Sequence, residues 1–217
     1  MANPPNYARE MEAVLARLAP QGGQKPRLLL HACCGPCSSA VLEQLLAHFE
    51  VTILYYNPNI WPAAEYRRRG DELERFAAAF APAMQVVEGD YDTGRYYEAV
   101  AGLEAEPERG GRCTVCYRMR MEEAARYAAA HGFDWFCTTL SISPHKDAAR
   151  INAIGQELEA QYGVRHLPND FKKKNGYKRS LELSAQYGLY RQDYCGCEFS
   201  ARRAAKEDAP DGPAGTV

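Results

Sequence analysis

The sequence predicts an α/β fold, with a mostly parallel sheet and helices on both of its faces. Short apolar segments alternate along the chain with longer segments of helical periodicity, which is the order that βαβ units require. At 217 residues, the chain can bury a sizeable core within one domain. No internal repeat and no change of composition marks a boundary inside this domain.

In the first half of the chain, apolar runs predict strands, and the segments between them predict helices. The run at 28–30 is followed by Ser38 and Ser39 and then by helical periodicity, which indicates a strand, a tight turn and a helix start. The expected elements are a helix at 7–18, a linker at 20–26, a strand at 28–30, a helix at 41–49, a strand at 50–56, a helix at 63–80, a strand at 84–87 and a helix at 96–103.

The second half continues the alternation. An acidic and then glycine-rich segment at 104–112 predicts a mobile loop, which delivers Cys113 and Cys116 to the start of a helix. Residues 209–217 are rich in Pro and Gly and are expected to be disordered. The expected elements are a helix that ends at residue 130, a strand at 133–140, a helix at 148–162, a strand at 164–167 and a helix at 181–187.

Composition limits the class of protein. The formal net charge of −2 gives no global attraction to nucleic acid, so such contact requires a local patch. No apolar run approaches the ~20 residues of a membrane span, and the N-terminal segment lacks the basic-then-apolar pattern of an export signal. We therefore expect a cytoplasmic protein, in which eight cysteines indicate metal or redox chemistry more than structural disulfides.

Three thiols follow the first predicted strand, in the sequence HACCGPCSS. Cys33, Cys34 and Cys37 lie where the carboxyl end of a parallel strand meets a helix, the position at which open α/β sheets place ligands. The unpaired N–H groups and positive partial charge of a helix N-terminus stabilise thiolates and anionic clusters. His31 precedes the thiols on the same turn. The sequence therefore predicts a reaction site here.

Two CxxC pairs, Cys34–Cys37 and Cys113–Cys116, have the spacing of a tetrahedral thiolate site, and iron–sulfur clusters are also held by thiolates. About eighty residues separate the pairs, so the fold must bring distant loops together. Adjacent Cys33 and Cys34 favour a cluster, because its irons are spread widely enough to accept both. Two other interpretations remain open: a zinc site that only stabilises the fold, and a thioredoxin-type redox centre at Cys34 and Cys37.

A third thiol pair, Cys195 and Cys197, lies near the C-terminus with one glycine between its members. The glycine supplies backbone freedom, so the pair can form a strained, reducible disulfide or bind a metal. The alternative is that both thiols are incidental. Asp193 and Tyr194 precede the pair and could orient or protonate a ligand. The remaining thiol, Cys137, lies inside an apolar strand and is expected to be a small buried hydrophobe.

The sequence SPHKD follows a predicted strand, where side chains face a cleft, and it contains His145 and Lys146. The other histidines after the first strand are expected to be surface or packing residues. They are His48, His131 and His166.

The segment 171–179, FKKKNGYKR, combines five positive charges with two aromatic residues. This composition suits phosphate contacts together with base stacking, although a charged segment can also be only a solvated loop. A second basic run at 67–69 is a weaker candidate, because acidic residues follow it. The candidate nucleic-acid contacts are Lys172, Lys173, Lys174, Tyr177, Lys178 and Arg179.

Six motifs, in order along the chain, resemble those of the QueH family of epoxyqueuosine reductases. They are HACCGPCSS, YYNPNI with EYRRR, RCTVCYRMR, TTLSISPHKD, NDFKKKNGYKRS and YRQDYCGCEFS, and they cover roughly residues 27–200. The resemblance implies a HUP-like, PP-loop-related fold with a C-terminal helical segment that carries the CxC pair. The usual SGGxDS phosphate loop is replaced here by HACCGPCS, which argues against ATP activation and against an ATP-using tRNA thiolation activity.

The resemblance also implies a reaction and its cofactors. The family deoxygenates epoxyqueuosine in the tRNA anticodon loop to an alkene, without cobalamin, and carries a 4Fe–4S cluster with an additional iron nearby. Cys195 and Cys197 match a pair associated with a redox-active disulfide. That pair and Cys37 are both candidates to hold the additional iron. The cluster cysteines of the family match Cys33, Cys34, Cys113 and Cys116 here.

The resemblance divides the chain into three parts. Residues 1–26 are expected to form an N-terminal helix and linker, 27–200 an iron–sulfur reductase domain, and 201–217 a tail that is disordered at its end. The implied partners are tRNA, through its anticodon loop, and an external electron donor. No membrane is implied.

Conversion of an epoxide to an alkene takes two electrons and two protons and releases water. We expect an iron beside the cluster to act as a Lewis acid, and the metals or the Cys195 and Cys197 dithiol to supply the electrons. Two other hypotheses compete: a thiol–disulfide oxidoreductase that uses Cys34 and Cys37, and a zinc-stapled tRNA-binding module without catalysis. The candidate proton donors are Asp193, His145 and Lys146.

Overall fold

A five-stranded sheet of strand order β3-β2-β1-β4-β5 forms the centre of the structure, a computed structural model that describes residues 5–18 and 24–201. All four strand pairs are parallel, as βαβ connections require. The α/β class and the parallel sheet expected from the sequence are thus confirmed. The strands are β1 (Arg27–His31), β2 (Glu50–Tyr55), β3 (Gln85–Glu88), β4 (Trp135–Thr138) and β5 (Arg165–His166).

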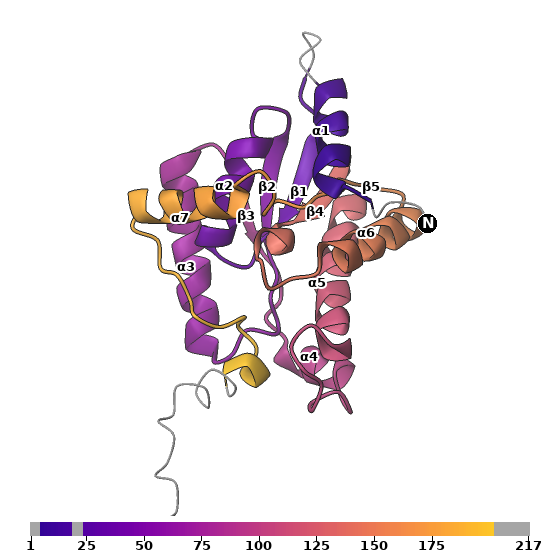
Figure 1. Ribbon diagram of the computed structural model, residues 1–217, viewed down its shortest axis with the longest axis vertical. Coiled ribbons are helices and arrows are strands. Elements are labelled where there is room, and N and C mark those ends of the chain that lie inside the picture. The colour runs from indigo at the N-terminus through magenta and orange to yellow at the C-terminus, as the bar shows by residue number, and fades with distance from the viewer. Residues whose placement is uncertain (1–4, 19–23, 202–217) are drawn as a thin grey trace, which may run out of the picture.

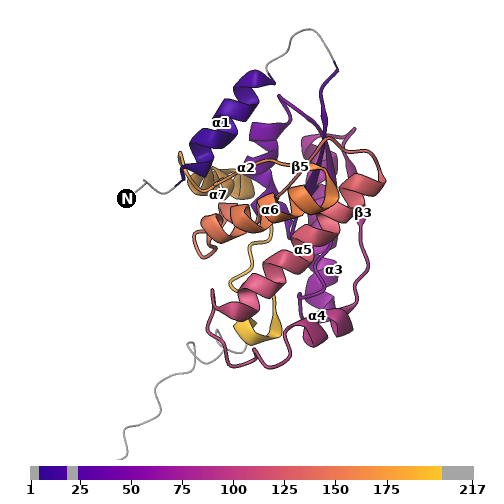
Figure 2. The ribbon, with the colours of Figure 1, turned by 90° about the vertical axis from the view of Figure 1, so that its right-hand side faces the viewer.

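Helices cover both faces of this sheet (Figure 1). Side chains alternate across a strand, so Leu28 and Leu30 of β1 pack in a core with α1, α2, α3 and α7, whereas Leu29 packs in a second core with α5 and α6. Figure 2 shows α5 and α6 crossing in front of the sheet. The helices of the described residues are α1 (Tyr7–Arg17), α2 (Gly35–Leu45), α3 (Ala63–Phe80), α4 (Thr93–Ala99), α5 (Gly111–Ala130), α6 (Ala148–Tyr162), α7 (Gly176–Gln186) and the 3-10 helix η1 (Thr139–Ile142).

Strands β1 and β4 are neighbours at the point where the strand order reverses. After β1 the chain turns to β2 on one side, and after β4 it turns to β5 on the other side. The loops that leave these two strands therefore separate and open a crevice at their carboxyl ends, which is where ligands bind in open α/β sheets. The thiols of the HACCGPCSS sequence follow β1, and Lys146 follows β4 and η1.

Helices α2 and α7 begin earlier than the sequence predicts. α2 starts at Gly35, directly after Cys34, with Pro36 in its first turn, where the missing N–H of proline costs nothing. α7 starts at Gly176 rather than at residue 181, so part of the predicted basic loop is helical. Gly176 allows this start, because a Cβ there would lie 1.9 Å from the carbonyl oxygen of Phe171.

The C-terminal thiol pair lies in an irregular segment after α7, and a final helical turn begins just beyond it at Glu198. The expected disorder at 209–217 and most of the expected linker at 20–26 lie outside the described residues. Among the residues that are described, no helix has the length and the apolar composition needed to cross a bilayer.

Candidate functional site

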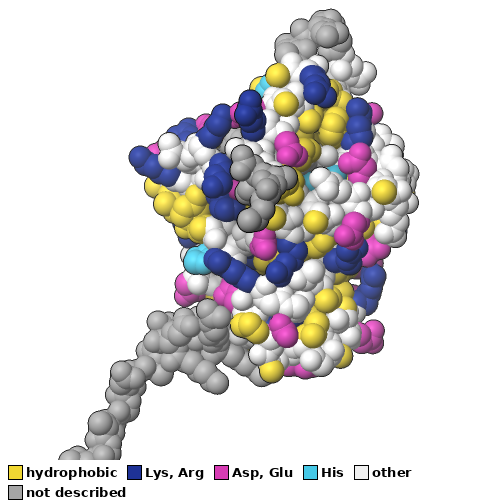
Figure 3. Space-filling model, turned by 45° about the vertical axis from the view of Figure 1, so that its right-hand side comes forward, with side chains coloured by type: hydrophobic (Ala, Val, Ile, Leu, Met, Phe, Trp, Pro, Cys, Tyr) yellow, Lys and Arg dark blue, Asp and Glu magenta, His cyan; other side chains and the backbone are white. Residues whose placement is uncertain are grey.

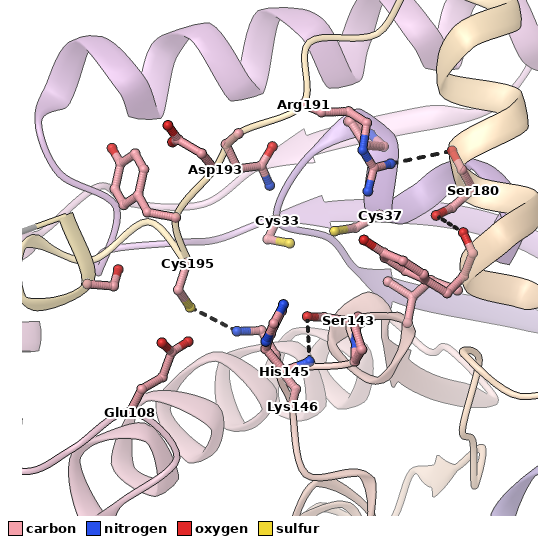
Figure 4. Close-up of a pocket in the computed structure, with 17 residues that line it drawn as sticks. Cys33, Cys37, Glu108, Ser143, His145, Lys146, Ser180, Arg191, Asp193 and Cys195 are labelled. Carbon is pink, nitrogen blue, oxygen red and sulfur yellow. Dashed lines mark hydrogen bonds between the residues drawn. The ribbon is translucent and has the colours of Figure 1, made fainter. Parts of the chain in front are cut away.

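A cavity of about 430 Å³ opens at the crevice between the carboxyl ends of β1 and β4 (Figure 4). Its walls come from segments far apart in the sequence: the turn after β1, the loop before α5, the end of η1 with the loop after it, the start of α7 and the segment with the CxC pair. Figure 4 shows the sulfurs of Cys33 and Cys37 turned toward each other in the middle of the cavity, with Cys195 and Lys146 beside them. Several thiols therefore face one polar cavity.

Cys33, Cys34 and Cys37 form a compact trio. Their sulfur atoms all lie within 4.8 Å of one another, and Sγ of Cys33 and Sγ of Cys34 are 3.8 Å apart. Hydrogen bonds from Cys34 and Cys37 lower the pKa of Cys33 well below its usual value. The hydrogen bond with Cys33 in turn raises the pKa of Cys34 to about 12. Cys33 is therefore the first of the three thiols to lose its proton. Three thiols at this spacing can serve as ligands to one metal ion.

Cys113 and Cys116 lie in the first two turns of α5, which begins at Gly111. The backbone N–H of Arg109 donates to Sγ of Cys113 over 3.3 Å. Burial raises the pKa of Cys116 to about 12, although nearby Arg120 opposes this effect. The two CxxC pairs therefore sit on separate helix starts, with Cys34 at one and this pair at the other.

Cys195 lies between the trio of Cys33, Cys34 and Cys37 and the pair of Cys113 and Cys116. It lines the large cavity together with Cys33 and Cys37, and it also lines an adjoining cavity of about 510 Å³ together with Cys113 and Cys197. Cys116 and Cys197 further share one small apolar cluster. The fold therefore brings all three predicted thiol groups to neighbouring walls of one region, but among the described residues only Cys33, Cys34 and Cys37 lie close enough together to share one metal ion. The set of ligands that would hold a cofactor stays a prediction.

The CxC segment is held by specific hydrogen bonds to the loop after β2. The backbone N–H of Trp61 donates to the carbonyl oxygen of Gly196 over 2.8 Å, and the hydroxyl of Tyr194 donates to the carbonyl oxygen of Trp61 over 2.6 Å. Gly196 has φ of +118°, a conformation that favours glycine. A Cβ there would also lie 2.9 Å from Nη1 of Arg69. The backbone freedom expected of this glycine is therefore confirmed.

Arg69 and Glu65 form a buried ion pair that supports the same segment. Nε of Arg69 donates to Oε1 of Glu65 over 2.6 Å, while its Nη1 and Nη2 donate to the carbonyl oxygens of Cys195 and Tyr194 over 3.4 and 3.5 Å. Removing one partner of a buried pair is costly, because the other charge is left without compensation. The pair thus fixes the position of Cys195 relative to α3.

Lys146 lies against Cys195. Its Nζ donates to Sγ of Cys195 over 2.8 Å. Partial burial disfavours the ammonium charge, but the neighbouring Cys195 and Tyr117 outweigh this effect and raise the pKa of Lys146. Lys146 also lowers the pKa of Cys33. It has the same effect on Cys113 and Cys116, so one cation acts on all three thiol groups.

His31, at the end of β1, is completely buried beneath the thiol turn. Its Nε2 lies 3.1 Å from the carbonyl oxygen of Tyr56 and its Nδ1 lies 2.8 Å from the hydroxyl of Thr138. A carbonyl only accepts, so Nε2 carries the proton and the Thr138 hydroxyl donates to Nδ1. Burial lowers the pKa of His31 to about 4. His31 thus links β1, β2 and β4 as a neutral side chain.

The remaining predicted polar residues have different environments. Asp193 lines the cavity and is exposed, and Figure 4 places it on the wall opposite Lys146. His145 is exposed, and its carbonyl oxygen accepts from Arg109 over 2.9 Å. Cys137 is 1% exposed inside β4, as expected of a buried hydrophobe. His166, predicted to be a surface or packing residue, is buried and therefore a packing residue.

The predicted nucleic-acid segment reaches the cavity through Tyr177, which lines it. Several of its charges are already paired: Lys172 with Asp170, Lys174 with Glu12, and Arg179 with Glu43 and Glu182. Lys173 and Lys178 are exposed and form no ion pair with a described residue. On the face in Figure 3, acidic and basic side chains are likewise interspersed.

Three polar residues around the thiols were not predicted. Nε2 of Gln192 donates to Sγ of Cys34 over 3.2 Å, and Arg69 and Arg120 are 1% and 2% exposed. The sequence holds a weak signal for Arg120: it lies four residues after Cys116, so both occupy one face of the helix that the CxxC pair begins. No comparable signal separates Arg69 from the two arginines before it.

The thiol donor set fits an iron–sulfur centre, since Cys thiolates are the ligands of such clusters. Cationic Lys146 and Arg120 lie close enough to lower the pKa of Cys33, and they suit a centre whose ligands are anionic. An all-parallel sheet with thiols from distant loops at its switch point defines an α/β protein with a cysteine-lined site for a metal or redox centre.

Comparison with known proteins identifies the family. Residues 28–203 match the family model described as Epoxyqueuosine reductase QueH, so the chain belongs to that family. A relative from Streptococcus pyogenes with this description is 41% identical over 201 residues, which covers 91% of this chain and 78% of the relative. One from Haemophilus influenzae is 43% identical over 189 residues, 86% of this chain and 76% of the relative. One from Thermotoga maritima is 35% identical over 176 residues, 80% of this chain and 89% of the relative.

Proposed function

We propose that this protein reduces epoxyqueuosine in the anticodon loop of tRNA to queuosine, in the cytoplasm and without cobalamin. The observation that supports the proposal is that Lys146 and thiols of three groups line two adjoining cavities at the crevice between β1 and β4, in a chain of the epoxyqueuosine reductase family. All eight cysteines are free thiols, which agrees with a reducing compartment.

The proposed cofactors are a 4Fe–4S cluster and an additional iron. When bound, they would supply single electrons and a Lewis acid for the epoxide oxygen. Cys37, whose sulfur lies within 4.8 Å of the sulfurs of Cys33 and Cys34, and the CxC pair are the candidate thiols for the additional iron. The proposed cluster ligands are Cys33, Cys34, Cys113 and Cys116.

The proposed reaction balances with the CxC dithiol as the source of two electrons. Oxidation of Cys195 and Cys197 to a disulfide releases two electrons and two protons, and the epoxide takes up both pairs to give the alkene and water. An external thiol or electron-transfer protein then reduces the disulfide for the next turnover. Cys195 suits this role because it is only partly buried and faces the cavity.

Lys146 is the proposed donor of the proton to the leaving oxygen. Its Nζ already donates to Sγ of Cys195, so proton and electrons would reach the substrate from the same side of the cavity. His145 and Asp193 are the alternative donors, and both are more exposed. A positioned general acid contributes about 10²–10⁴-fold to rate.

The proposed tRNA contacts are those of the basic segment at the cavity. Tyr177 would stack on an unpaired base, because base–aromatic stacking is the usual means of holding splayed loop nucleotides. The lysines and arginine of the segment would contact loop phosphates. The proposed contacts are Lys172, Lys173, Lys174, Tyr177, Lys178 and Arg179.

One experiment tests the proposal directly. Protein purified without oxygen is analysed for iron, zinc and acid-labile sulfide, and is then mixed with epoxyqueuosine-containing tRNA and a reductant. We expect iron and sulfide to be present and queuosine to appear in the nuclease digest by mass spectrometry. Zinc without sulfide and no queuosine would favour the zinc-stapled module. Metal-free protein that exchanges disulfides through Cys34 and Cys37 would favour the thiol–disulfide oxidoreductase.

A further inference from the structure

Arg120 is a buried cation in the middle of the thiol region. It lies on α5, one turn after Cys116, and its side chain is 2% exposed. Its Nε donates to the carbonyl oxygen of Cys116 over 3.1 Å. Its Nη2 is buried and has no hydrogen-bond partner. Because buried polar groups are nearly always hydrogen-bonded, this nitrogen is available to an acceptor that faces the thiol region.

No carboxylate of residues 5–18 or 24–201 compensates the charge of Arg120. Among the residues that the structure describes, none forms an ion pair with it. The groups that interact most strongly with its charge are the thiols of Cys116, Cys195 and Cys33, followed by the hydroxyl of Tyr117. The buried Arg69 differs in this respect, since Glu65 lies 2.6 Å from its Nε.

A buried charge without an opposite charge is strongly unfavourable. The anion-forming groups around Arg120 are thiols, and they come from all three predicted groups: Cys33 from the turn after β1, Cys116 from α5 and Cys195 from the C-terminal segment. Thiols become anions when they ligate a metal or cluster. The positive charge of the guanidinium is therefore compensated only when these sulfurs are thiolates.

We infer that Arg120 is the counter-charge of the thiolate centre, a positioning residue that compensates the negative charge of the sulfurs from three segments and leaves Nη2 free for an anionic sulfur. The inference rests on the proposed cluster for the identity of the anion. It goes beyond the proposed cluster ligands, because Arg120 binds no iron in this scheme. Its charge, rather than its hydrogen bond to Cys116, is the functional property.

The test compares Arg120→Met with Arg120→Lys. Both variants lose the guanidinium geometry, but only lysine keeps the charge. In Arg120→Met we expect iron to be lost to a chelator about 10–100-fold faster, as for other residues that support metal ligands. We also expect a more negative reduction potential, because a nearby cation favours the added electron. Arg120→Lys should lie close to wild type in both measurements.

A readout on metal-free protein keeps the inference independent of cluster loading. Labelling of Cys33 by iodoacetamide at pH 7, read by peptide mass, should slow at least about threefold in Arg120→Met and remain near the wild-type rate in Arg120→Lys. Thermal unfolding of the same samples reports whether each variant folds.

The outcomes separate this inference from the proposed function. Wild-type protein that takes up no iron and sulfide contradicts the proposed cluster, and the Cys33 labelling rates then decide on Arg120 alone. The inference would be overturned if Arg120→Met loses iron, is reduced and is labelled at Cys33 in the same way as the wild-type protein. Equal losses in Arg120→Lys and Arg120→Met would overturn it too, because the role would then be steric.

Discussion

Nζ of Lys146 and Sγ of Cys195 are 2.8 Å apart, across a cavity wall formed by the loop after η1 and the C-terminal segment. The two residues are separated by 48 others in the sequence, and neither lies in a helix or strand. The contact therefore depends on two loops being held in place, one by the packing of η1 and α6 and the other by Arg69 and Trp61.

Lys146→Met should remove the proposed proton donor. We expect single-turnover formation of queuosine per bound iron to fall by about 10²–10⁴-fold, because the leaving oxygen would lack its acid. The rate is normalised to iron content, since Lys146 also lowers the pKa of Cys33. His145→Ala and Asp193→Asn are the matched variants for the two alternative donors and should each cost less than about tenfold. A larger loss in either of them than in Lys146→Met would transfer the role to that residue.

Cys113→Ala should cost the protein most of its iron. Changes in residues that only support metal ligands already reduce affinity by about 10–100-fold, so loss of a ligand should cost at least as much. Iron and acid-labile sulfide measured after anaerobic gel filtration check this expectation. Cys137→Ala is the control, because Cys137 is buried inside β4 and is not a ligand in the proposed site. This variant should retain its iron. Full retention in Cys113→Ala would remove that residue from the ligand set.

The basic segment offers a test within itself. Lys173 and Lys178 are exposed and form no ion pair with described residues, whereas Lys174 is paired with Glu12. Lys173→Ala with Lys178→Ala should therefore weaken tRNA binding and lower the slope of log affinity against log salt by about 1 to 2. Lys174→Ala, whose charge is partly neutralised, should change the slope less. An unchanged slope in the double variant would exclude the segment from the interface.

Helix boundaries could be predicted where apolar periodicity reaches the helix ends. α3 and α6 have the predicted bounds, and α6 is further fixed by Asp147 at its N-cap and Gly163 after its last turn. The starts of α2 and α7 could not be predicted, because thiols, serines and lysines occupy their first turns and give no apolar pattern. In both cases the misassigned turn lines the cavity, through Cys37 in α2 and Tyr177 in α7.

The grouping of the thiols follows from the sequence more directly than their surroundings do. The sequence places Cys33 and Cys34 after a strand and Cys113 and Cys116 at the start of a helix, and in a parallel sheet both positions lie at the carboxyl ends of the strands. The partners Arg120, Arg69 and Gln192 act through tertiary contacts, and nothing local distinguishes a buried arginine from a solvated one. The position of Lys146 after a strand predicts that it faces the site, but its contact with Cys195 depends on the tertiary fold.

Protonation of His166 should destabilise the protein in acid. His166 is 3% exposed beside Gly155, where a Cβ would lie 2.4 Å from its ring, and neither ring nitrogen has a hydrogen-bond partner. Burial lowers the pKa of His166 from 6.5 to about 3. The unfolded chain therefore binds a proton that the native state excludes, so stability is complete above pH 6.5 and falls as the pH drops from 6.5 toward 3, by up to about 1.4 kcal/mol per pH unit.

His166→Leu should flatten this acid dependence and keep or increase stability at pH 7, because an unsatisfied buried polar group is removed. Urea unfolding of metal-free protein at several pH values between 4 and 7 measures both effects. His166→Gln is the matched variant: it removes the titration but keeps a buried polar group, so it should flatten the slope without the gain at pH 7. His31, with its pKa near 4, supplies a residual slope in every variant. An acid slope in His166→Leu equal to that of wild type would contradict this account, because a different group would then control the acid sensitivity.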